Sequence, residues 1–207
     1  MSIASDIAAK LLQINAIKLS PQNPFTWASG MKSPIYCDNR LVLSYPDIRS
    51  RVIEAFVEKA NEFGEADVIV GVATAGIPHG ALVAEKMEKP FIYVRSKAKA
   101  HGRQNQIEGK VNPGDKAIVI EDLISTGGSV LKAVEALRDQ NIEVIGVMAI
   151  FTYGFEKADQ AFAAADCAFT TLSNYEALIE EAAKQQYIKP DEIEVLRQWR
   201  KSPDKWM

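Results

Sequence analysis

Residues 117–129 read Ala-Ile-Val-Ile-Glu-Asp-Leu-Ile-Ser-Thr-Gly-Gly-Ser, and this stretch decides the fold. Its apolar residues 117–120 are mostly β-branched and predict a buried strand, which ends where the two acidic residues begin. A small, glycine-rich turn follows, and the apolar spacing of residues 130–140 predicts a helix after it. Strand, turn and helix in this order indicate an α/β protein, in which ligands bind at the carboxyl ends of the strands.

The turn Ser-Thr-Gly-Gly-Ser, residues 125–129, has the composition of an anion site. Glycines let the backbone approach a phosphate closely, and free N–H groups at the start of a helix point toward the anion. The three hydroxyl side chains add donors. Glu121 and Asp122 would repel a phosphate, so we expect them to face vicinal ribose hydroxyls or a divalent cation. The residues therefore predict a pocket for a ribose 5-phosphate, with a ligand-free tight turn before a capped helix as the alternative.

Composition limits the class of protein. With 207 residues, of which 47% are hydrophobic, the chain is long enough to bury one sizeable core. Its net charge of −3 disfavours a general nucleic-acid binder. No apolar run approaches the roughly 20 residues of a membrane span, and residues 1–15 lack a secretory signal, so we expect a cytoplasmic location. Cys37 and Cys167 lie far from each other and from both histidines, which predicts neither a zinc cluster nor a disulfide framework.

Strand and helix patterns alternate from the middle of the chain onward, which favours a mostly parallel sheet flanked by helices. The expected strands cover residues 67–73, 91–94, 117–120, 143–151 and 167–170. The expected helices cover residues 3–12, 47–62, 76–88, 130–140 and 156–165, with one that runs to residue 186 behind a capping box at 173–176 and a last one from residue 191. No linker or repeat is evident, so residues 1–207 are predicted to form a single domain.

Residues 95–111 interrupt this pattern. They are polar and contain one acid, Glu108, among the cations Arg95, Lys97, Lys99, His101, Arg103 and Lys110. Because the segment has no sustained apolar period, it is not expected to pack, and loops this long are commonly functional or disordered. Beside a phosphate pocket it predicts a lid that neutralises a polyanion. The alternative is a solvated basic loop.

Three motifs in this order resemble orotate phosphoribosyltransferases, which are type I phosphoribosyltransferases. Residues 25–40, Phe-Thr-Trp-Ala-Ser-Gly-Met-Lys-Ser-Pro-Ile-Tyr-Cys-Asp-Asn-Arg, resemble the N-terminal segment that builds the base pocket. Arg95, Lys99, His101 and Gly102 match the Arg-x-x-x-Lys-x-His-Gly pattern of the lid loop. Residues 117–129 resemble the motif that binds 5-phosphoribosyl 1-diphosphate (PRPP).

The resemblance covers about residues 7–180 and implies the type I phosphoribosyltransferase fold. In that fold a central, mostly parallel sheet is flanked by helices, here with an α/β core of about residues 65–172. An N-terminal hood of about residues 1–45 holds the base pocket. A flexible lid loop covers about residues 95–111.

The resemblance also implies a role for each matching residue. The implied PRPP-binding residues of the motif are Glu121, Asp122, Leu123, Ile124, Ser125, Thr126, Gly127, Gly128 and Ser129. Arg95, Lys99 and His101 are implied to contact the diphosphate, with Lys99 and His101 as catalytic residues. Ser125 is also implied to lie near orotate. Residues 73–78 resemble the diphosphate-binding turn of the family.

The implied activity joins orotate to PRPP and gives orotidine 5′-monophosphate and diphosphate, a step of pyrimidine biosynthesis. The implied cofactor is Mg²⁺, bound mainly through PRPP rather than by protein ligands. The resemblance also implies a homodimer in which the lid loop of one subunit reaches the site of its neighbour. Neither nucleic acid nor a membrane is an expected partner.

The chain departs from the family pattern at several cations. Ala28, Ala75 and Ser96 stand where many members carry a cation, and no arginine follows the fourth core strand near Tyr153. Lys97 and Lys32 are candidate substitutes, in the lid and in the base pocket. The tryptophans Trp27, Trp199 and Trp206 are scattered in the sequence and are not expected to form a stacking platform, and His79 is expected to pack or cap.

Three alternatives remain open: a transferase for another base such as a purine, a non-catalytic PRPP-sensing regulator, and a structural α/β protein with a chance match. Residues 25–40 favour orotate over a purine. A regulator would carry a DNA-binding domain or a basic surface, and this acidic chain shows neither pattern. A chance match is disfavoured by the agreement of three ordered motifs.

Overall fold

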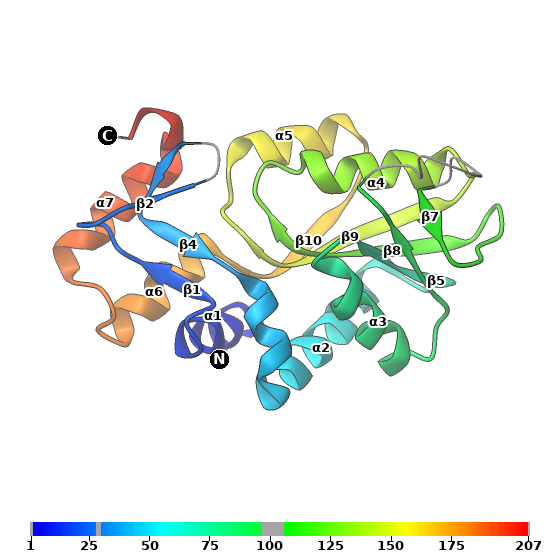
Figure 1. The fold of residues 1–207 in the computed structure, drawn as a ribbon, viewed down its shortest axis with the longest axis horizontal. Coiled ribbons are helices and arrows are strands. Elements are labelled where there is room, and N and C mark those ends of the chain that lie inside the picture. The colour runs from blue at the N-terminus through cyan, green and yellow to red at the C-terminus, as the bar shows by residue number, and fades with distance from the viewer. Residues whose placement is uncertain (1, 28–29, 97–105, 207) are drawn as a thin grey trace.

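A computed structural model describes residues 2–27, 30–96 and 106–206. Its centre is a six-stranded sheet with the strand order β10-β9-β8-β5-β6-β7 (Figure 1). The strands are β5 (Val68–Val72), β6 (Phe91–Val94), β7 (Ile107–Glu108), β8 (Lys116–Ile124), β9 (Glu143–Thr152) and β10 (Phe169–Asn174). Neighbouring strands are parallel except β6 and β7, which are antiparallel. The predicted α/β class with a mostly parallel sheet is confirmed.

Helices cover both faces of this sheet (Figure 1). They are α1 (Ile3–Gln13), α2 (Pro46–Ala60), α3 (Gly76–Lys86), α4 (Gly128–Arg138), α5 (Glu156–Ala164), α6 (Tyr175–Lys184) and α7 (Pro190–Lys201), with short 3-10 helices η1 (Asn39–Ser44), η2 (Asn61–Phe63) and η3 (Pro203–Lys205). The first three lie on one face, and α4 and α5 lie on the other. The predicted α-helices agree with these bounds to within two residues at each end.

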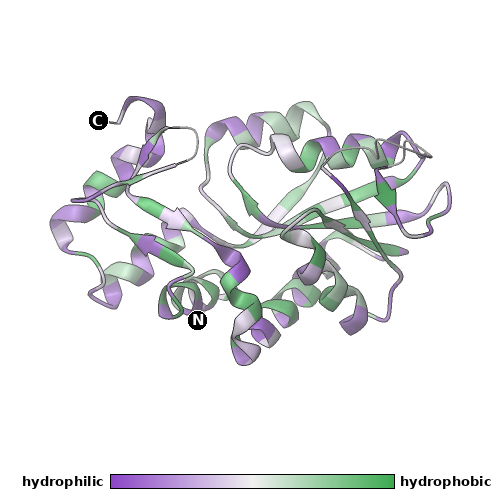
Figure 2. Ribbon diagram, viewed as in Figure 1, coloured by the Kyte–Doolittle hydropathy of each residue, from purple (hydrophilic) through white to green (hydrophobic). Residues whose placement is uncertain are grey.

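Alternation along the strands builds a buried layer on each face of the sheet. On β8, Ile118 and Ile120 point into the layer under α2 and α3, whereas Ala117 and Val119 point into the layer under α4 and α5. Figure 2 shows the apolar residues gathered in the central strands and the polar ones on the outer sides of the helices. This two-sided burial explains why the core strands are near-continuous apolar runs in the sequence.

The N-terminal segment and the C-terminal helices lie at one end of the sheet (Figure 1). Strand β1 (Ile17–Leu19) pairs with β4 (Ile35–Cys37), and β2 (Phe25–Thr26) pairs with β3 (Lys32–Ser33), both antiparallel. Residues 25–40 have no periodic pattern in the sequence, yet they contain β2, β3, β4 and the start of η1. Strands of two or three residues are too short for alternation to be visible, so only their partners define them.

Three local predictions were wrong. Strand β8 continues through Glu121 to Ile124 instead of ending at Ile120, because β9 supplies ladder partners along its whole length. The lid segment does pack at one place, since β7 pairs with β6 and Ile107 is buried. The N-cap of α6 is Asn174, whose side chain accepts from the N–H of Ala177, whereas Ser173 is buried and donates to the carbonyl of Ala4.

Candidate active site

The loop between β8 and α4 encloses a cavity of about 110 Å³, which we call the loop cavity. Its lining comprises Glu121, Leu123 and residues 125–130. Gly127 has φ = +81°, a left-handed conformation that disfavours side chains, and α4 begins at the next residue. The first N–H groups of α4 therefore open toward the cavity together with three hydroxyl side chains, as a phosphate site requires.

Two carboxylates stand on the last residues of β8 before this loop. Glu121 is 7% exposed, and its Oε1 accepts from the N–H of Asp122 at 2.9 Å. Burial first, and then the neighbouring Asp122, raise the pKa of Glu121 to about 9. Asp122 is half-buried, and its carbonyl accepts from Nδ2 of Asn39 at 2.7 Å. The loop thus carries one buried carboxyl group with a raised pKa and one more accessible carboxyl group, an arrangement suited to hydrogen bonds with hydroxyls.

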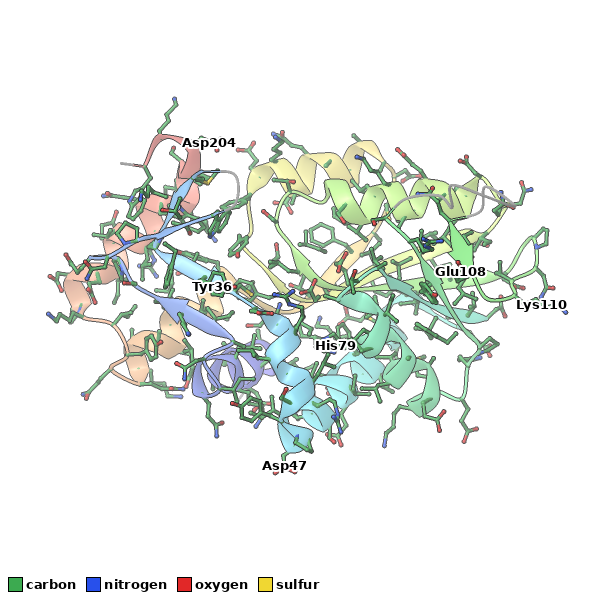
Figure 3. All side chains as sticks on the ribbon, viewed as in Figure 1. Tyr36, Asp47, His79, Glu108, Lys110 and Asp204 are labelled. Carbon is green, nitrogen blue, oxygen red and sulfur yellow. The ribbon has the colours of Figure 1, made fainter. Side chains whose placement is uncertain are left out.

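A second cavity of about 320 Å³, the aromatic cavity, joins the loop to the N-terminal strands. It is lined by Thr26, Trp27, Tyr36, Cys37, Leu123, Ser125 and Tyr153. Figure 3 shows Tyr36 on β4, beside the central sheet. Burial, followed by the charges of Cys37 and Asp122, raises the pKa of Tyr153 well above its ordinary value, so its hydroxyl stays neutral. Flat apolar walls beside a phosphate loop suit a planar heterocycle.

The tryptophans are scattered in the sequence, but the fold brings them together. Trp27 and Trp199 lie with their ring centroids 5.8 Å apart, and both contact Tyr153, at 5.3 and 5.9 Å. Phe155 stacks on Tyr153 at 5.4 Å. Trp206 packs against the same core from the C-terminal end. The cluster joins residues that are more than a hundred positions apart, so no local sequence pattern could have revealed it.

A third cavity of about 320 Å³, the α7 cavity, shares Trp27 and Ser125 with the aromatic cavity. Ser125, Thr126 and Phe155 line it together with the cations Arg200 and Lys201 of α7. Ser125 is thus common to the loop, aromatic and α7 cavities. Its position agrees with the implied double role beside both the phosphate and the base.

Arg95 lies near the start of α4, at a cavity separate from the loop cavity. It lines a cavity of about 220 Å³ together with Ala73, Ser96, Ser129 and Lys132. Its Nη1 lies 3.5 Å from Oε1 of Glu108 on β7. Lys132, one turn into α4, is a cation that the sequence motifs did not single out, because its spacing is that of an ordinary exposed helix position.

Comparison with known proteins decides the family. The phosphoribosyl transferase domain family matches residues 42–186 of this chain. The chain belongs to the phosphoribosyltransferase family. Over 207 residues this phosphoribosyltransferase is 53% identical to the orotate phosphoribosyltransferase of Listeria monocytogenes, covering 100% of the chain and 99% of the relative. It is 55% identical over 202 residues to the enzyme of the same name from Bacillus caldolyticus, covering 97% and 98%.

Solved structures agree with this assignment. An orotate phosphoribosyltransferase from Aeropyrum pernix superposes with a TM-score of 0.76 at 26% identity, covering 88% of this chain and 99% of the other. A UMP synthase from Leishmania donovani superposes with a TM-score of 0.80 at 27% identity, covering 95% of this chain and 42% of that longer chain. The type I phosphoribosyltransferase fold and the resemblance to orotate phosphoribosyltransferases are confirmed.

Arg95 lines the cavity beside α4, and the other predicted site residues of this phosphoribosyltransferase divide into three groups. Those that line the loop cavity are Glu121, Leu123, Ser125, Thr126, Gly127, Gly128 and Ser129. Asp122 and Ile124 are not among these lining residues, and the side chain of Ile124 is buried in the layer under α4 and α5. Lys97, Lys99 and His101 lie outside the described residues, as does Ala28. The binding and catalytic roles of all these residues stay predictions.

The structure also places the turn before α3, His79 and Lys32, which the sequence analysis had singled out. The turn at residues 73–76 leads directly into α3, and a Cβ on Gly76 would lie 2.3 Å from the carbonyl oxygen of Ile120, so only glycine allows this approach. His79 is fully buried, and burial lowers its pKa to about 4, as expected for a packing residue. Lys32 donates to Oγ1 of Thr26 at the aromatic cavity. No helix in the described parts of the chain is long and apolar enough to cross a membrane.

Proposed function

We propose that the protein transfers the phosphoribosyl group of PRPP to orotate, giving orotidine 5′-monophosphate and diphosphate. The identity of 53% to an orotate phosphoribosyltransferase over the whole chain carries this proposal. The match covers the whole chain and 99% of the relative, so both the PRPP motif and the base-pocket segment have counterparts in that enzyme. The purine-specific alternative is disfavoured for the same reason.

The geometry supports a division of the substrates between two cavities. The loop cavity takes the 5-phosphate of PRPP, held by the backbone of residues 125–128 and by neighbouring hydroxyls. The carboxylate of Asp122 accepts hydrogen bonds from the ribose hydroxyls, and Glu121 fixes the backbone of Asp122. The aromatic cavity takes the pyrimidine ring, with Ser125 at the point where sugar and base meet.

In the reaction, N1 of orotate forms a bond to the anomeric carbon of the ribose while the bond to the diphosphate oxygen breaks. The electron pair of that bond leaves with the diphosphate, and orotate supplies N1 in its deprotonated form, so the protein needs no general base. Catalysis then rests on holding the reactants in line and stabilising charge on the diphosphate. We assign the second task to Arg95, Lys99 and His101.

Phosphoribosyltransferases generally use Mg²⁺ with PRPP, and the donor set here fits an ion that is held mainly by the substrate. No group of three acidic, histidine or cysteine side chains converges in the described residues. Burial raises the pKa of Glu121, and Asp122 is the less buried of the two carboxyl groups, so Asp122 is better placed to meet such an ion. Mg²⁺ on the diphosphate would neutralise charge that develops on the leaving group.

The decisive assay follows the loss of orotate absorbance after the protein is mixed with PRPP and Mg²⁺, with uracil and adenine tested in parallel. Consumption of orotate alone is the expected result. Turnover of adenine would instead establish a purine enzyme. Binding of PRPP without turnover of any base would refute the proposal in favour of a PRPP-sensing protein.

We also propose a homodimer in which each lid loop serves the neighbouring site. An exposed apolar surface supports it: Tyr36 is 43% exposed, Leu41 38%, Tyr45 43% and Leu82 36%. The first three follow one another from β4 through η1 to α2, and Leu82 borders a hollow of about 300 Å³ between α2 and α3. Exposed apolar side chains that gather on one surface are a common mark of a protein–protein interface.

Mixing two inactive variants tests the sharing of the lid. A hybrid dimer of Lys99→Ala and Asp122→Asn subunits has both changes in one site and neither in the other. Random re-association should restore roughly a quarter of wild-type activity if the lid crosses the interface. If each lid serves its own subunit, the mixture stays inactive.

The cytoplasmic location expected from the sequence stays a prediction.

A further inference from the structure

We propose that Arg200 of α7 binds the carboxylate of the pyrimidine substrate and so selects orotate over uracil. This inference rests on the proposed function. Orotate differs from uracil by a carboxylate on the ring carbon next to N1, and burying an unpaired carboxylate against aromatic walls would be costly. A site that accepts this ring must therefore place a cation beside its flat apolar surface.

Arg200 occupies such a place. It lines the α7 cavity together with Ser125, Trp27 and Phe155, and Ser125 and Trp27 also line the aromatic cavity. Its Nη1 lies 3.6 Å from the position that a Cβ on Gly154 would occupy, where the chain leaves β9. The guanidinium therefore reaches the carboxyl ends of the central strands, although it comes from the C-terminal helix.

The charge of Arg200 is available to a ligand. Glu176 is its acidic neighbour, but Nη1 of Arg200 lies 3.9 Å from Oε2 of Glu176, beyond hydrogen-bond distance. Oε1 of Glu176 accepts instead from Nε and Nη2 of Arg197, at 3.1 and 2.5 Å. Within the described residues Arg200 donates no hydrogen bond, and its side chain is 34% exposed. Its planar fork of donors suits a carboxylate in bidentate geometry.

Packing holds this arginine in position. Trp199, the preceding residue, is fully buried and contacts Trp27, Tyr153 and Phe155, with ring centroids 5.5 to 5.9 Å apart. The same cluster forms walls of the cavities for the base. The backbone that carries Arg200 is thus fixed by the residues between which the ring would lie.

The other charged residues of the α7 cavity are less suited. Lys157 and Lys201 are exposed, so their ammonium groups are solvated and bind a carboxylate weakly. Glu156 and Asp204 are also exposed, so water screens their repulsion of an anion in the cavity. Figure 3 shows Asp204 at the C-terminal end of the chain. Arg200 is the half-buried cation among them.

A matched pair of nucleotides tests the inference. Orotidine 5′-monophosphate and uridine 5′-monophosphate differ by the carboxylate alone, and calorimetry with the full chain gives the affinity for each. Arg200→Gln should weaken binding of the first about 10- to 100-fold, as expected for a charge-assisted hydrogen bond. Binding of the second should change less than about twofold, and Arg200→Lys should fall between wild type and Arg200→Gln.

Kinetics and a control variant complete the test. Arg200→Gln should raise the KM for orotate and leave the KM for PRPP unchanged. Lys201→Gln, at the next and exposed position of the same helix, controls for loss of a cation from α7. Equal weakening of both nucleotides would show a structural role and overturn the inference, as would unchanged affinity for the orotidine nucleotide. If the wild-type protein does not turn over orotate, the proposed function fails first, and this inference fails with it.

Discussion

Replacing Glu121 with Gln should make the ligand-free protein more stable, and the gain should grow with pH. Glu121 is almost fully buried at the end of β8, and its pKa is raised from 4.5 to about 9, chiefly by that burial. Between these values the unfolded chain has lost a proton that the folded protein retains. The contribution of this group to stability is therefore complete below pH 4.5 and decreases as the pH rises toward 9.

The size of the effect follows from the shift. Each pH unit in this window lowers the free energy of unfolding by about 1.4 kcal/mol. At pH 7 the free energy of unfolding is therefore roughly 3 kcal/mol lower than at low pH. Gln has nearly the same shape, keeps an oxygen to accept from the N–H of Asp122 and does not titrate. E121Q should therefore gain about 4 kcal/mol relative to wild type between pH 5 and pH 8.

Urea unfolding at several pH values measures this difference directly. Glu181 provides a matched control, because it is 6% exposed but its oxygens accept from Gln185 and lie 3.4 Å from Nζ of Lys184. E181Q removes a buried carboxylate that has donors, so it should not stabilise the protein. A stability difference between E121Q and wild type that stays constant from pH 5 to pH 8 would refute the argument about Glu121.

Three further substitutions test the site. Lys99→Ala should reduce kcat by about 10²- to 10³-fold while PRPP binding changes little, if Lys99 acts on the leaving diphosphate; equal loss in both would exclude a transition-state contact. Asp122→Asn should weaken PRPP binding in calorimetry, with Asp139→Asn at the far end of α4 as the control; unchanged affinity for PRPP would contradict the assignment. Gly127→Ala should destabilise the protein by about 1–3 kcal/mol, because φ is +81° and the new Cβ would lie 2.9 Å from a phenylalanine ring of α5. Gly128→Ala, where a Cβ meets open space, should be tolerated in thermal unfolding; equal losses in the two glycine variants would argue against the steric reason.

Periodic burial made the core predictable from the sequence. Residues such as Ile118 and Val119 lie in a strand that is covered on both faces, and that arrangement requires a run of apolar, β-branched side chains. The position of the glycine-rich turn followed from the same strand, because the turn lies at the junction between that strand and the next helix. Most helix ends were also accessible, since caps and turns are local, although the cap of α6 is Asn174 rather than Ser173.

Contacts between distant segments were not predictable in this way. Trp27 and Trp199 meet only because the N-terminal strands and α7 are placed at the same end of the sheet, and neither residue has a local pattern that indicates the other. The end of β8 was misplaced because Glu121 and Asp122 look like the start of a loop. In the fold, ladder pairing with β9 continues past them and determines the strand.

The aromatic cluster has a consequence for how this enzyme can diverge. Its members Trp27 and Trp199 both lie outside residues 42–186, the part of the chain that the general phosphoribosyl transferase family shares. The proposed phosphate loop is thus encoded in the middle of the gene, whereas the aromatic walls of the proposed base site also need residues from its two ends. Substitutions or exchanges at the termini can alter which ring is accepted while the inherited phosphoribosyl site stays intact. A chain shortened before Trp199 should accordingly keep the loop cavity and lose its means of choosing a base.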